Sequence, residues 1–260
     1  MTPLYDQIGT TYDVTRKADP EIVRRLRHHL NVADGNRVLD VACGTGNYTV
    51  ALAGTGLQMT GYDISTVMIE NAREKFEQVD WHEGDVHQLP YESGVFQGAV
   101  CTLSIHHFEQ LAGAFREVYR TLDRGRFVIF TSSPEQMKHY WLNEYFPEAL
   151  EKSITQMPSI ETVNEALKQA GFTLIGAESF LLDPHIQDLF LYSGKFAPEL
   201  YLDERIRSGM STFAHLASVE EVRAGCAKLK LDIETNKIKD VLERYHSRFG
   251  DYMYVVAEKK

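Results

Sequence analysis

The apolar and polar positions between residues 34 and 131 follow two alternating periods, and this pattern predicts strands and helices in turn. Short apolar runs such as RVLDVAC and RFVIFT are typical of buried strands, whereas the stretches between them repeat apolar residues at helical spacing. The clearest amphipathic helix is expected over 109–122, with an apolar stripe formed by Leu111, Phe115, Val118 and Leu122. Such alternation indicates a doubly wound, mostly parallel sheet with helices on both faces.

Further elements are expected on either side of this region. A helix over 20–30 is predicted by apolar residues at helical spacing, with Asp19 as its N-cap and Pro20 at its first position. A second helix is expected in SIETVNEALKQA, which ends at Gly171. Strands are expected in FTLIGAESFLL and in DYMYVVAEKK at the end of the chain.

The ten residues VLDVACGTGN, positions 38–47, are predicted to form a strand, a tight turn and the start of a helix. Gly44 and Gly46 let the backbone turn sharply and expose N–H groups to a ligand, while the helix N-terminus favours an anionic group. Asp40 would repel a phosphate, but an amino acid carries both an ammonium and a carboxylate. Because the third glycine of G-x-G-x-x-G is replaced by Thr49, an amino-acid-bearing nucleoside is favoured over NAD.

Two further acids follow the next two predicted strands. Asp63 lies 19 residues after Gly44, where a doubly wound fold hydrogen-bonds ribose hydroxyls. Asp85, in WHEGDVHQLPY, is expected at the end of a third strand, where its carboxylate can accept a hydrogen bond from an adenine amino group. Three consecutive strands are therefore each predicted to end near a carboxylate.

These segments together resemble a known family. VLDVACGTGN, GYDIS with MIENAR, EGDVHQLPY, TLSIHHF and GRFVIFT occur in the order and at the spacing of the class I S-adenosylmethionine-dependent methyltransferases, of the small-molecule type that includes the ubiquinone and menaquinone enzymes. The resemblance implies a seven-stranded sheet, S-adenosylmethionine as the cofactor and S-adenosylhomocysteine as the product, with no metal. It covers about half of the chain.

The resemblance also implies which residues bind the cofactor. YDxxxxxYDxxR near the N-terminus is similar to the family's flap over the cofactor, and the alternative for this segment is a solvated loop. Leu103 and Ser104 are expected to line the methionine arm of the cofactor. The full predicted set is Tyr12, Arg16, Asp40, Gly44, Gly46, Asp63, Ile64, Met68, Asp85, Val86, Leu103 and Ser104.

Compared with the family pattern, the chain carries two additions. One occupies 133–158, and the other lies within the 68 residues between Leu182 and Asp251, where the family usually has a short turn. The second addition looks helical, with a capping box from Ser218 to Glu221 and an apolar face formed by Ile238, Val241, Leu242 and Tyr245. The predicted organisation is a flap over 1–33, a cofactor-binding core over 34–182 and 250–260, and a helical cap over 133–158 and 183–249.

The cap is expected to cover the transferred methyl group and to supply the acceptor pocket, because ligands of open α/β sheets bind beyond the carboxyl ends of the strands. Tyr140, Trp141 and Tyr145 are candidates for a wall of this pocket. The alternative for this aromatic cluster is simple core packing of a helix.

Methyl transfer is an in-line displacement that requires mainly alignment of the reacting atoms and exclusion of water. His106 and His107 follow the fourth strand, where the family places residues beside the transferred methyl, and a histidine there can remove a proton from the acceptor at neutral pH. The alternative is that one or both brace the loop. His139, His185 and His215 are weaker candidates within the predicted cap.

Composition limits the partners. A formal charge of −10 and a pI near 5.5 disfavour nucleic acid, as does the absence of the Asn/Asp-Pro-Pro-aromatic motif from the loop after the fourth strand. Cys43, Cys101 and Cys226 form no C-x-x-C pair, so neither a disulfide framework nor a zinc site is indicated. With no apolar run long enough to span a membrane and no signal peptide, a cytoplasmic protein with a small-molecule acceptor is expected.

Two alternatives remain at this level. The same acids and glycines suit a non-catalytic sensor or partner protein that binds S-adenosylmethionine or its product. An NAD-dependent dehydrogenase is disfavoured by Asp40 and by the missing third glycine.

Overall fold

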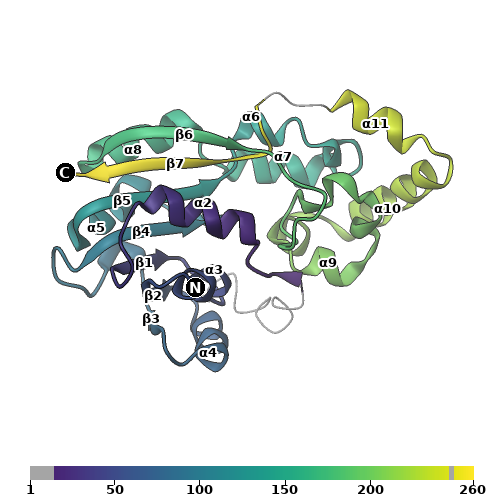
Figure 1. Ribbon diagram of the computed structural model, residues 1–260. Helices are drawn as coiled ribbons and strands as arrows, with labels where there is room; N and C mark the ends of the chain where they lie inside the picture. Colours follow the sequence, from purple (N-terminus) through teal and green to yellow (C-terminus); the bar gives the residue numbers. More distant parts are fainter. Residues whose placement is uncertain (1–14, 246–248) are drawn as a thin grey trace.

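A seven-stranded sheet in the order β3-β2-β1-β4-β5-β7-β6 forms the centre of the computed structural model, which describes residues 15–245 and 249–260 (Figure 1). All neighbouring strands are parallel except β7, which is antiparallel to both β5 and β6. The predicted doubly wound, mostly parallel sheet is therefore confirmed. The strands are β1 (Arg37–Val41), β2 (Gln58–Asp63), β3 (Asp80–Glu83), β4 (Phe96–Thr102), β5 (Leu122–Thr131), β6 (Thr173–Phe180) and β7 (Tyr252–Lys259).

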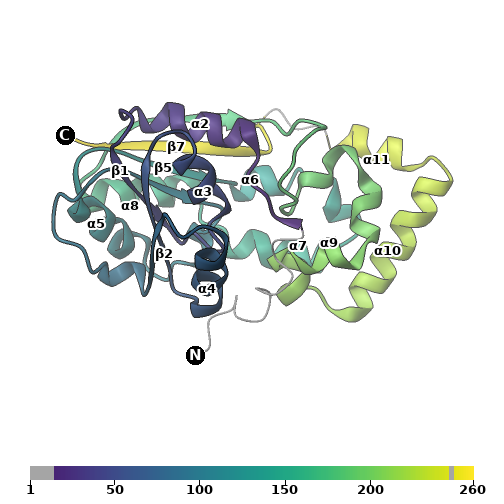
Figure 2. The same cartoon turned by 60° about the horizontal axis from the view of Figure 1, so that its bottom comes forward.

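Helices cover both faces of the sheet, as Figures 1 and 2 show. One face carries α2 (Pro20–Leu30), α3 (Asn47–Ala53) and α4 (Thr66–Lys75), and the other carries α5 (Leu111–Thr121) and α8 (Ile160–Ala170). Consecutive residues of β1 belong to different apolar clusters, Val38 to the first and Leu39 to the second. Because both faces are buried, the strands read as continuous apolar runs.

Two of the expected boundaries differ from the structure. Helix α5 ends at Thr121, and Leu122 begins β5, which is therefore longer than the apolar run RFVIFT. The buried face of α5 is formed by Ala114, Phe115, Val118 and Thr121. Phe96 of β4 pairs with Leu122 and Gly98 pairs with Arg126, so the polar residues between Leu122 and Arg126 lie at a register shift, which an apolar pattern does not reveal.

The two additions are a short insertion (133–158) and a long insertion (183–249). The short insertion follows β5 and the long insertion follows β6, so both leave from the carboxyl ends of parallel strands, and they lie together beyond that end of the sheet (Figures 1 and 2). The short insertion contains α6 (Pro134–Met137), η4 (Trp141–Glu144) and α7 (Pro147–Gln156). The long insertion contains η5 (Ser193–Phe196), η6 (Pro198–Leu202), α9 (Glu204–Ser208), η7 (Thr212–Leu216), α10 (Val219–Glu234) and α11 (Ile238–Arg244).

Glu221 joins the two insertions. Its carboxylate accepts hydrogen bonds from the backbone N–H groups of Glu148 (2.8 Å) and Ala149 (3.1 Å), and so caps the start of α7. Ser218 accepts from the N–H of Glu221 at 3.1 Å, so only the serine half of the predicted capping box forms. The Glu221 side chain therefore bonds to the start of α7 and not to the start of its own helix.

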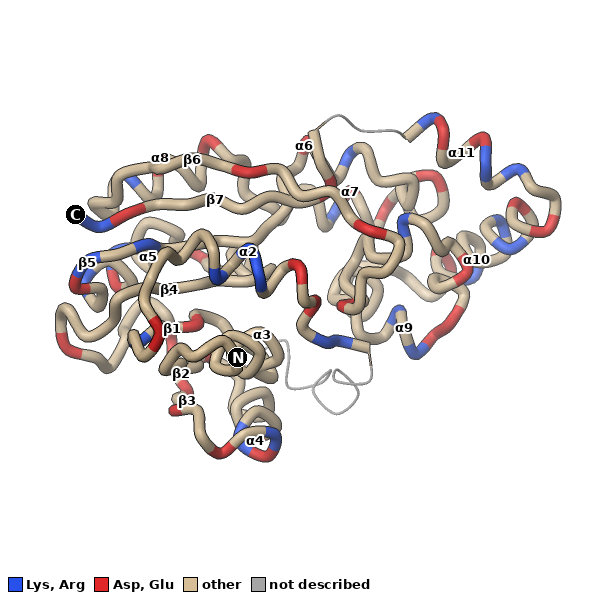
Figure 3. The backbone as a smooth tube through the Cα atoms, in the orientation of Figure 1, with Lys and Arg blue, Asp and Glu red and all other residues tan. Residues whose placement is uncertain are grey.

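Helices α10 and α11 carry acidic and basic residues interspersed along their length (Figure 3). In α10 only Gly225 and Leu229 are buried, which agrees with a solvated helix face. No helix in the described ranges combines the length and the apolar character needed to cross a membrane.

Asp19 holds the start of α2 against the long insertion. One carboxylate oxygen accepts from the N–H groups of Glu21 (3.0 Å) and Ile22 (3.2 Å), and the other accepts from the N–H of Gln187 (3.0 Å). The side chain therefore satisfies donors on two chain segments 168 residues apart.

We expect Asp19→Ala to lower the free energy of unfolding by roughly 2 to 3 kcal/mol, because it removes a helix cap and leaves the N–H of Gln187 without its acceptor. Ser159→Ala is the matched control, since the Ser159 side chain caps α8 through hydrogen bonds to Thr162 of the same helix, and should cost about 1 kcal/mol. Urea unfolding measures both variants. Equal losses would contradict the second role of Asp19.

Candidate functional site

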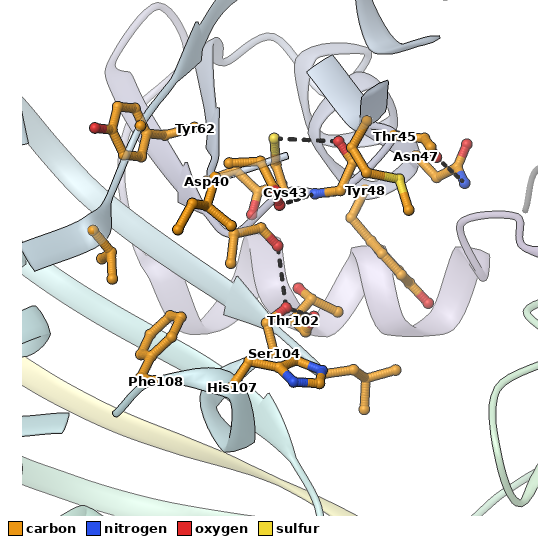
Figure 4. A pocket seen from close by; sticks show the side chains of 18 of the residues that line it. Asp40, Cys43, Thr45, Asn47, Tyr48, Tyr62, Thr102, Ser104, His107 and Phe108 are labelled. Atoms are coloured by element: carbon orange, nitrogen blue, oxygen red, sulfur yellow. Dashed lines mark hydrogen bonds between the residues drawn. The ribbon is translucent and has the colours of Figure 1, made fainter. Parts of the chain in front are cut away.

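A cavity of about 310 Å³ lies at the carboxyl ends of β1, β2 and β4, where the order of strands in the sheet reverses. Figure 4 shows Asp40, Cys43 and Tyr48 on one side of this cavity and His107 and Phe108 on the other. Most of the residues predicted to bind a cofactor or to flank the methyl group line it, namely Arg16, Asp40, Gly44, Asp63, Ile64, Met68, Asp85, Val86, Leu103, Ser104 and His107. We call this cavity the first cavity.

The backbone at two strand ends adopts the left-handed conformation without glycine. Ala42, just beyond β1, has φ 57°, and Leu103, just beyond β4, has φ 56°. The hydroxyl of Ser104 lies 2.7 Å from the carbonyl oxygen of Thr102 and 3.1 Å from that of Ala42, so this side chain connects the two turns. Non-glycine residues in this conformation are held by their surroundings and cluster at functional sites.

Asp40 is almost completely buried, with 1% of its surface exposed. The hydroxyl of Thr49 donates to one carboxylate oxygen at 2.6 Å, while the other oxygen is buried with no hydrogen-bond partner. Burial raises the pKa of Asp40 to about 7, and the nearby charge of Asp63 also raises it, whereas the Thr49 hydroxyl lowers it. A buried acceptor without a donor, facing a cavity, suits a ligand that brings a cation.

Asp63 organises the glycine turn. One carboxylate oxygen accepts from the N–H of Gly44 at 2.8 Å, and the other accepts from the N–H of Ser65 at 2.9 Å. A carboxylate oxygen has a second lone pair, so Asp63 can also accept from a ligand hydroxyl. The sequence indicated the ligand-facing position but not the bonds that fix the loop.

The two glycines of the turn have different surroundings. A Cβ on Gly44 would meet no atom within 4 Å, and Gly44 lines the cavity at φ 56°. A Cβ on Gly46 would lie 2.2 Å from the Trp81 ring, and Gly46 is not among the residues that line the cavity. Gly46 is therefore needed for packing against Trp81 of β3, and its predicted contact with the cofactor stays a prediction.

Asp85 caps the turn η2 (Val86–Gln88) at the far end of the first cavity. Its carboxylate accepts from the backbone N–H of His87 at 2.9 Å and lies 2.6 Å from the His87 ring nitrogen Nδ1. The backbone hydrogen bond, followed by the side-chain bond to His87, lowers the pKa of Asp85. Asp85 is therefore a charged acceptor at the rim.

A second cavity of about 80 Å³ adjoins the first and is bounded by both insertions. The two cavities share Arg16 and Leu103 as lining residues. The walls of the second cavity are Arg16, Leu103, His106, Ser132, Met137, Tyr140, Ser153, Met157, Phe190, Leu191, Gly209, Met210, Ser211, Thr212 and Tyr252.

The consecutive residues His106 and His107 stand at different cavities. His106 lines the second cavity and His107 lines the first, with their ring centroids 3.9 Å apart. Desolvation lowers the pKa of His107, with a further contribution from His215, and desolvation lowers the pKa of His106 well below its usual value. His106 is half-buried, and His107 is exposed where it lines the first cavity. Because the pKa of each histidine is lowered, both imidazoles are neutral at physiological pH.

The predicted aromatic wall is divided between two environments. Tyr140 lines the second cavity and donates to the carbonyl of Asp251 at 2.5 Å. Trp141 packs edge-on against Tyr201, and the Tyr145 hydroxyl donates to Asp232 at 3.0 Å; neither is among the residues lining the two cavities. These two side chains take part in core packing. Tyr12 lies outside the described residues.

Several residues that line the first cavity were not predicted from the sequence. Asp188 comes from the long insertion, where no motif marks it, and Tyr48 lies in α3 just after the glycine turn. The remaining additions are Ala42, Cys43, Thr45, Asn47, Tyr62, Gly84, His87, Thr102, Phe108 and Glu109. Over 15–245 and 249–260, no three His, Cys, Asp or Glu side chains are grouped so that they could hold a metal ion.

Comparison with known proteins agrees with this geometry. A family described as a methyltransferase domain matches residues 39–130. The demethylmenaquinone methyltransferase of Chlorobaculum parvum is 28% identical over 200 residues, which cover 65% of this chain and 83% of that protein. The corresponding enzyme of Staphylococcus aureus is 28% identical over 183 residues, covering 60% and 76%.

The solved structure described as a "putative methyltransferase from antibiotic biosynthesis pathway" of Anabaena variabilis is similar over nearly the whole chain. It is 31% identical with a TM-score of 0.84, and the match covers 93% of this chain and 98% of that one. The chain belongs to the class I S-adenosylmethionine-dependent methyltransferases. It is of the quinone-methyltransferase-like type, so the predicted family and the prediction of an enzyme are confirmed.

The likeness of this methyltransferase to the Anabaena structure extends beyond the sheet. The family match at 39–130 ends with β5, whereas the structural match covers most of the insertions as well. The insertions are thus part of a shared architecture.

We expect Gly44→Ala to affect mainly ligand binding and Gly46→Ala to affect mainly the free energy of unfolding. Each places Ala in a left-handed conformation at a cost of roughly 1 to 2 kcal/mol of stability. Gly46→Ala must also displace Trp81, so its loss of stability should be clearly larger, whereas Gly44→Ala should fold but bind S-adenosylhomocysteine more weakly. Urea unfolding and calorimetry separate the two effects. Equal stability losses would contradict the packing role of Gly46.

A second prediction concerns pH. Because the pKa of Asp40 is raised to about 7, the carboxylate that attracts an ammonium forms only as the pH rises. The affinity for S-adenosylhomocysteine should therefore increase roughly fivefold or more between pH 6 and 7.5. Asp40→Asn should bind more weakly and without this dependence, as measured by calorimetry. An unchanged pH profile in Asp40→Asn would rule out this assignment.

Proposed function

We propose that this enzyme transfers a methyl group from S-adenosylmethionine in the first cavity to a small, uncharged acceptor in the second. The observation that carries the proposal is the junction at Arg16 and Leu103, where the two cavities share their walls. A donor site and an acceptor site that meet at one place satisfy the main demand of an in-line displacement, which is alignment.

The first cavity suits the cofactor at both ends of the molecule. Asp40 offers its buried, unpartnered oxygen to the ammonium of the methionine part. Asp63, beside the glycine turn, accepts from the ribose hydroxyls, and Asp85 with Val86 receives the adenine at the rim. When bound, the cofactor supplies a methyl group on a positively charged sulfur, and the bond from carbon to sulfur breaks as the bond to the acceptor forms.

The second cavity suits a compact and largely apolar acceptor. Its walls include Met137, Met157, Phe190, Leu191 and Met210, with hydroxyl groups at scattered positions and Arg16 as its charged residue. The side chain of Arg16 is already paired with Asp188, so the cavity does not attract an anion. The relatives named as demethylmenaquinone methyltransferases support a small-molecule acceptor, and the charge of −10 argues against nucleic acid.

The histidines between the cavities act mainly by orienting the acceptor. The lowered pKa of His106, which lines the second cavity, makes it a weak proton acceptor for a hydroxyl group of high pKa, whereas its neutral imidazole is a good hydrogen-bond acceptor. We assign His106 to the acceptor side and His107 to the cofactor side. An acceptor that reacts as an acidic phenol or a neutral amine needs no stronger base.

The parts of the chain then have separate tasks. The core over 34–182 and 250–260 holds the cofactor, while the insertions at 133–158 and 183–249 close the acceptor cavity. The N-terminal segment over 1–33 contributes Arg16 to the junction. Residues of both insertions line the second cavity next to the junction, which restricts the access of water to it.

The test is methyl transfer from labelled S-adenosylmethionine to a panel of phenols, amines and reduced quinones, read by mass spectrometry of the acceptor. We expect at least one compact aromatic acceptor to be methylated. Met210→Phe, which narrows the second cavity, should raise the KM for that acceptor about tenfold and leave the affinity for S-adenosylhomocysteine within about twofold.

Met253→Phe is the matched control, because Met253 lies on β7 away from both cavities. It should leave both quantities near their wild-type values. If Met210→Phe changed neither, or if it weakened only cofactor binding, the second cavity would not be the acceptor site.

A further inference from the structure

Asp188 joins three distant parts of the chain at the boundary between the cavities. The Arg16 guanidinium donates to both of its carboxylate oxygens, at 2.5 and 3.2 Å, and the Tyr48 hydroxyl donates to one of them at 3.0 Å. Arg16 belongs to the N-terminal segment, Tyr48 to α3 after the glycine turn, and Asp188 to the long insertion. The Asp188 side chain is 1% exposed.

Neighbouring backbone contacts hold Asp188 in place. The N–H of Gln187 donates to Asp19 at 3.0 Å, and the N–H of Leu189 donates to the carbonyl of Thr15 at 3.1 Å. Three consecutive residues of the long insertion are thus bonded to the segment that carries Arg16. The position of the charge pair is therefore fixed by the fold.

The ion pair of Arg16 and Asp188 lies where its net charge affects the binding of a charged ligand. Arg16 lines both cavities and Asp188 lines the first. An unpaired guanidinium at the junction would repel a positively charged ligand group, and inside a protein such a repulsion is stronger than in water. The carboxylate of Asp188 cancels it.

We propose that Asp188 is a positioning residue that neutralises Arg16 at the junction and so lets the first cavity accept a sulfonium. This inference rests on the proposed function. It implies that Asp188 favours the positively charged S-adenosylmethionine over the neutral product S-adenosylhomocysteine, which differs from it by one methyl group and one charge. The pair therefore contributes to the exchange of product for substrate.

The test measures Kd for both ligands by calorimetry and follows their ratio. In Asp188→Asn, Kd for S-adenosylmethionine should rise about tenfold relative to Kd for S-adenosylhomocysteine, because the guanidinium charge is no longer cancelled. In Arg16→Gln, which leaves the carboxylate uncancelled, the ratio should shift in the opposite direction. The double variant Arg16→Gln/Asp188→Asn should return to within about twofold of the wild-type ratio.

Asp34→Asn is the matched control, since Asp34 forms an exposed ion pair with Arg27 at 2.8 Å away from both cavities. It changes the net charge as Asp188→Asn does, and should leave the ratio unchanged. Circular dichroism shows whether each variant is folded. If Asp188→Asn does not fold, Arg16→Gln and the double variant still carry the test.

The inference would be overturned if Asp188→Asn raised Kd equally for both ligands, or if Arg16→Gln left the ratio of the two Kd values unchanged. Asp188 would then have a structural role only. Failure of the wild-type protein to bind either ligand would instead overturn the proposed function. The two failures are therefore distinguishable.

Discussion

Asp40 keeps a carboxyl group almost entirely out of water at the carboxyl end of β1, beside a second buried acid, Asp63. Burial and mutual repulsion both oppose its ionisation, and its pKa is raised to about 7. Since the unfolded pKa is near 3.9, the stability that Asp40 contributes is present below that pH and is lost as the pH rises through 7. A bound cation reverses this loss, so the site is built for a ligand that brings positive charge.

The rest of the site can be understood from this constraint. The Asp63 carboxylate accepts hydrogen bonds from the N–H groups of Gly44 and Ser65, and these bonds fix the glycine turn. Arg16, the nearby cation at the junction, is neutralised by Asp188, so it does not compete with the charge of a ligand. The neutral histidines add no charge of their own. The protein groups at the junction therefore sum to no net charge, and the charge there is that of the bound ligand.

The insertions give this arrangement its second cavity. A sheet with helices on both faces provides a crevice at its switch point but no enclosed space for an acceptor. Glu221 caps α7 across the boundary between the insertions, and Gln187 and Leu189 bond to the segment before α2. The two insertions are thereby bonded to each other and to the segment that carries Arg16. This arrangement places the ion pair of Arg16 and Asp188 between the two cavities.

The sequence by itself determined the order of strands and helices, the start of α2 at Pro20, and the acids Asp40, Asp63 and Asp85 near three strand ends. Each of these features is encoded within a window of about ten residues, because periodicity, caps and glycine turns are local. Only the tertiary structure decided that Gly46 packs on Trp81, that Trp141 and Tyr145 belong to the core, and that His106 and His107 face different cavities. Asp188 is the clearest case, since its partners Arg16 and Tyr48 lie 172 and 140 residues away. Contacts over such separations depend on how packed elements meet, and no local pattern in the chain carries that information.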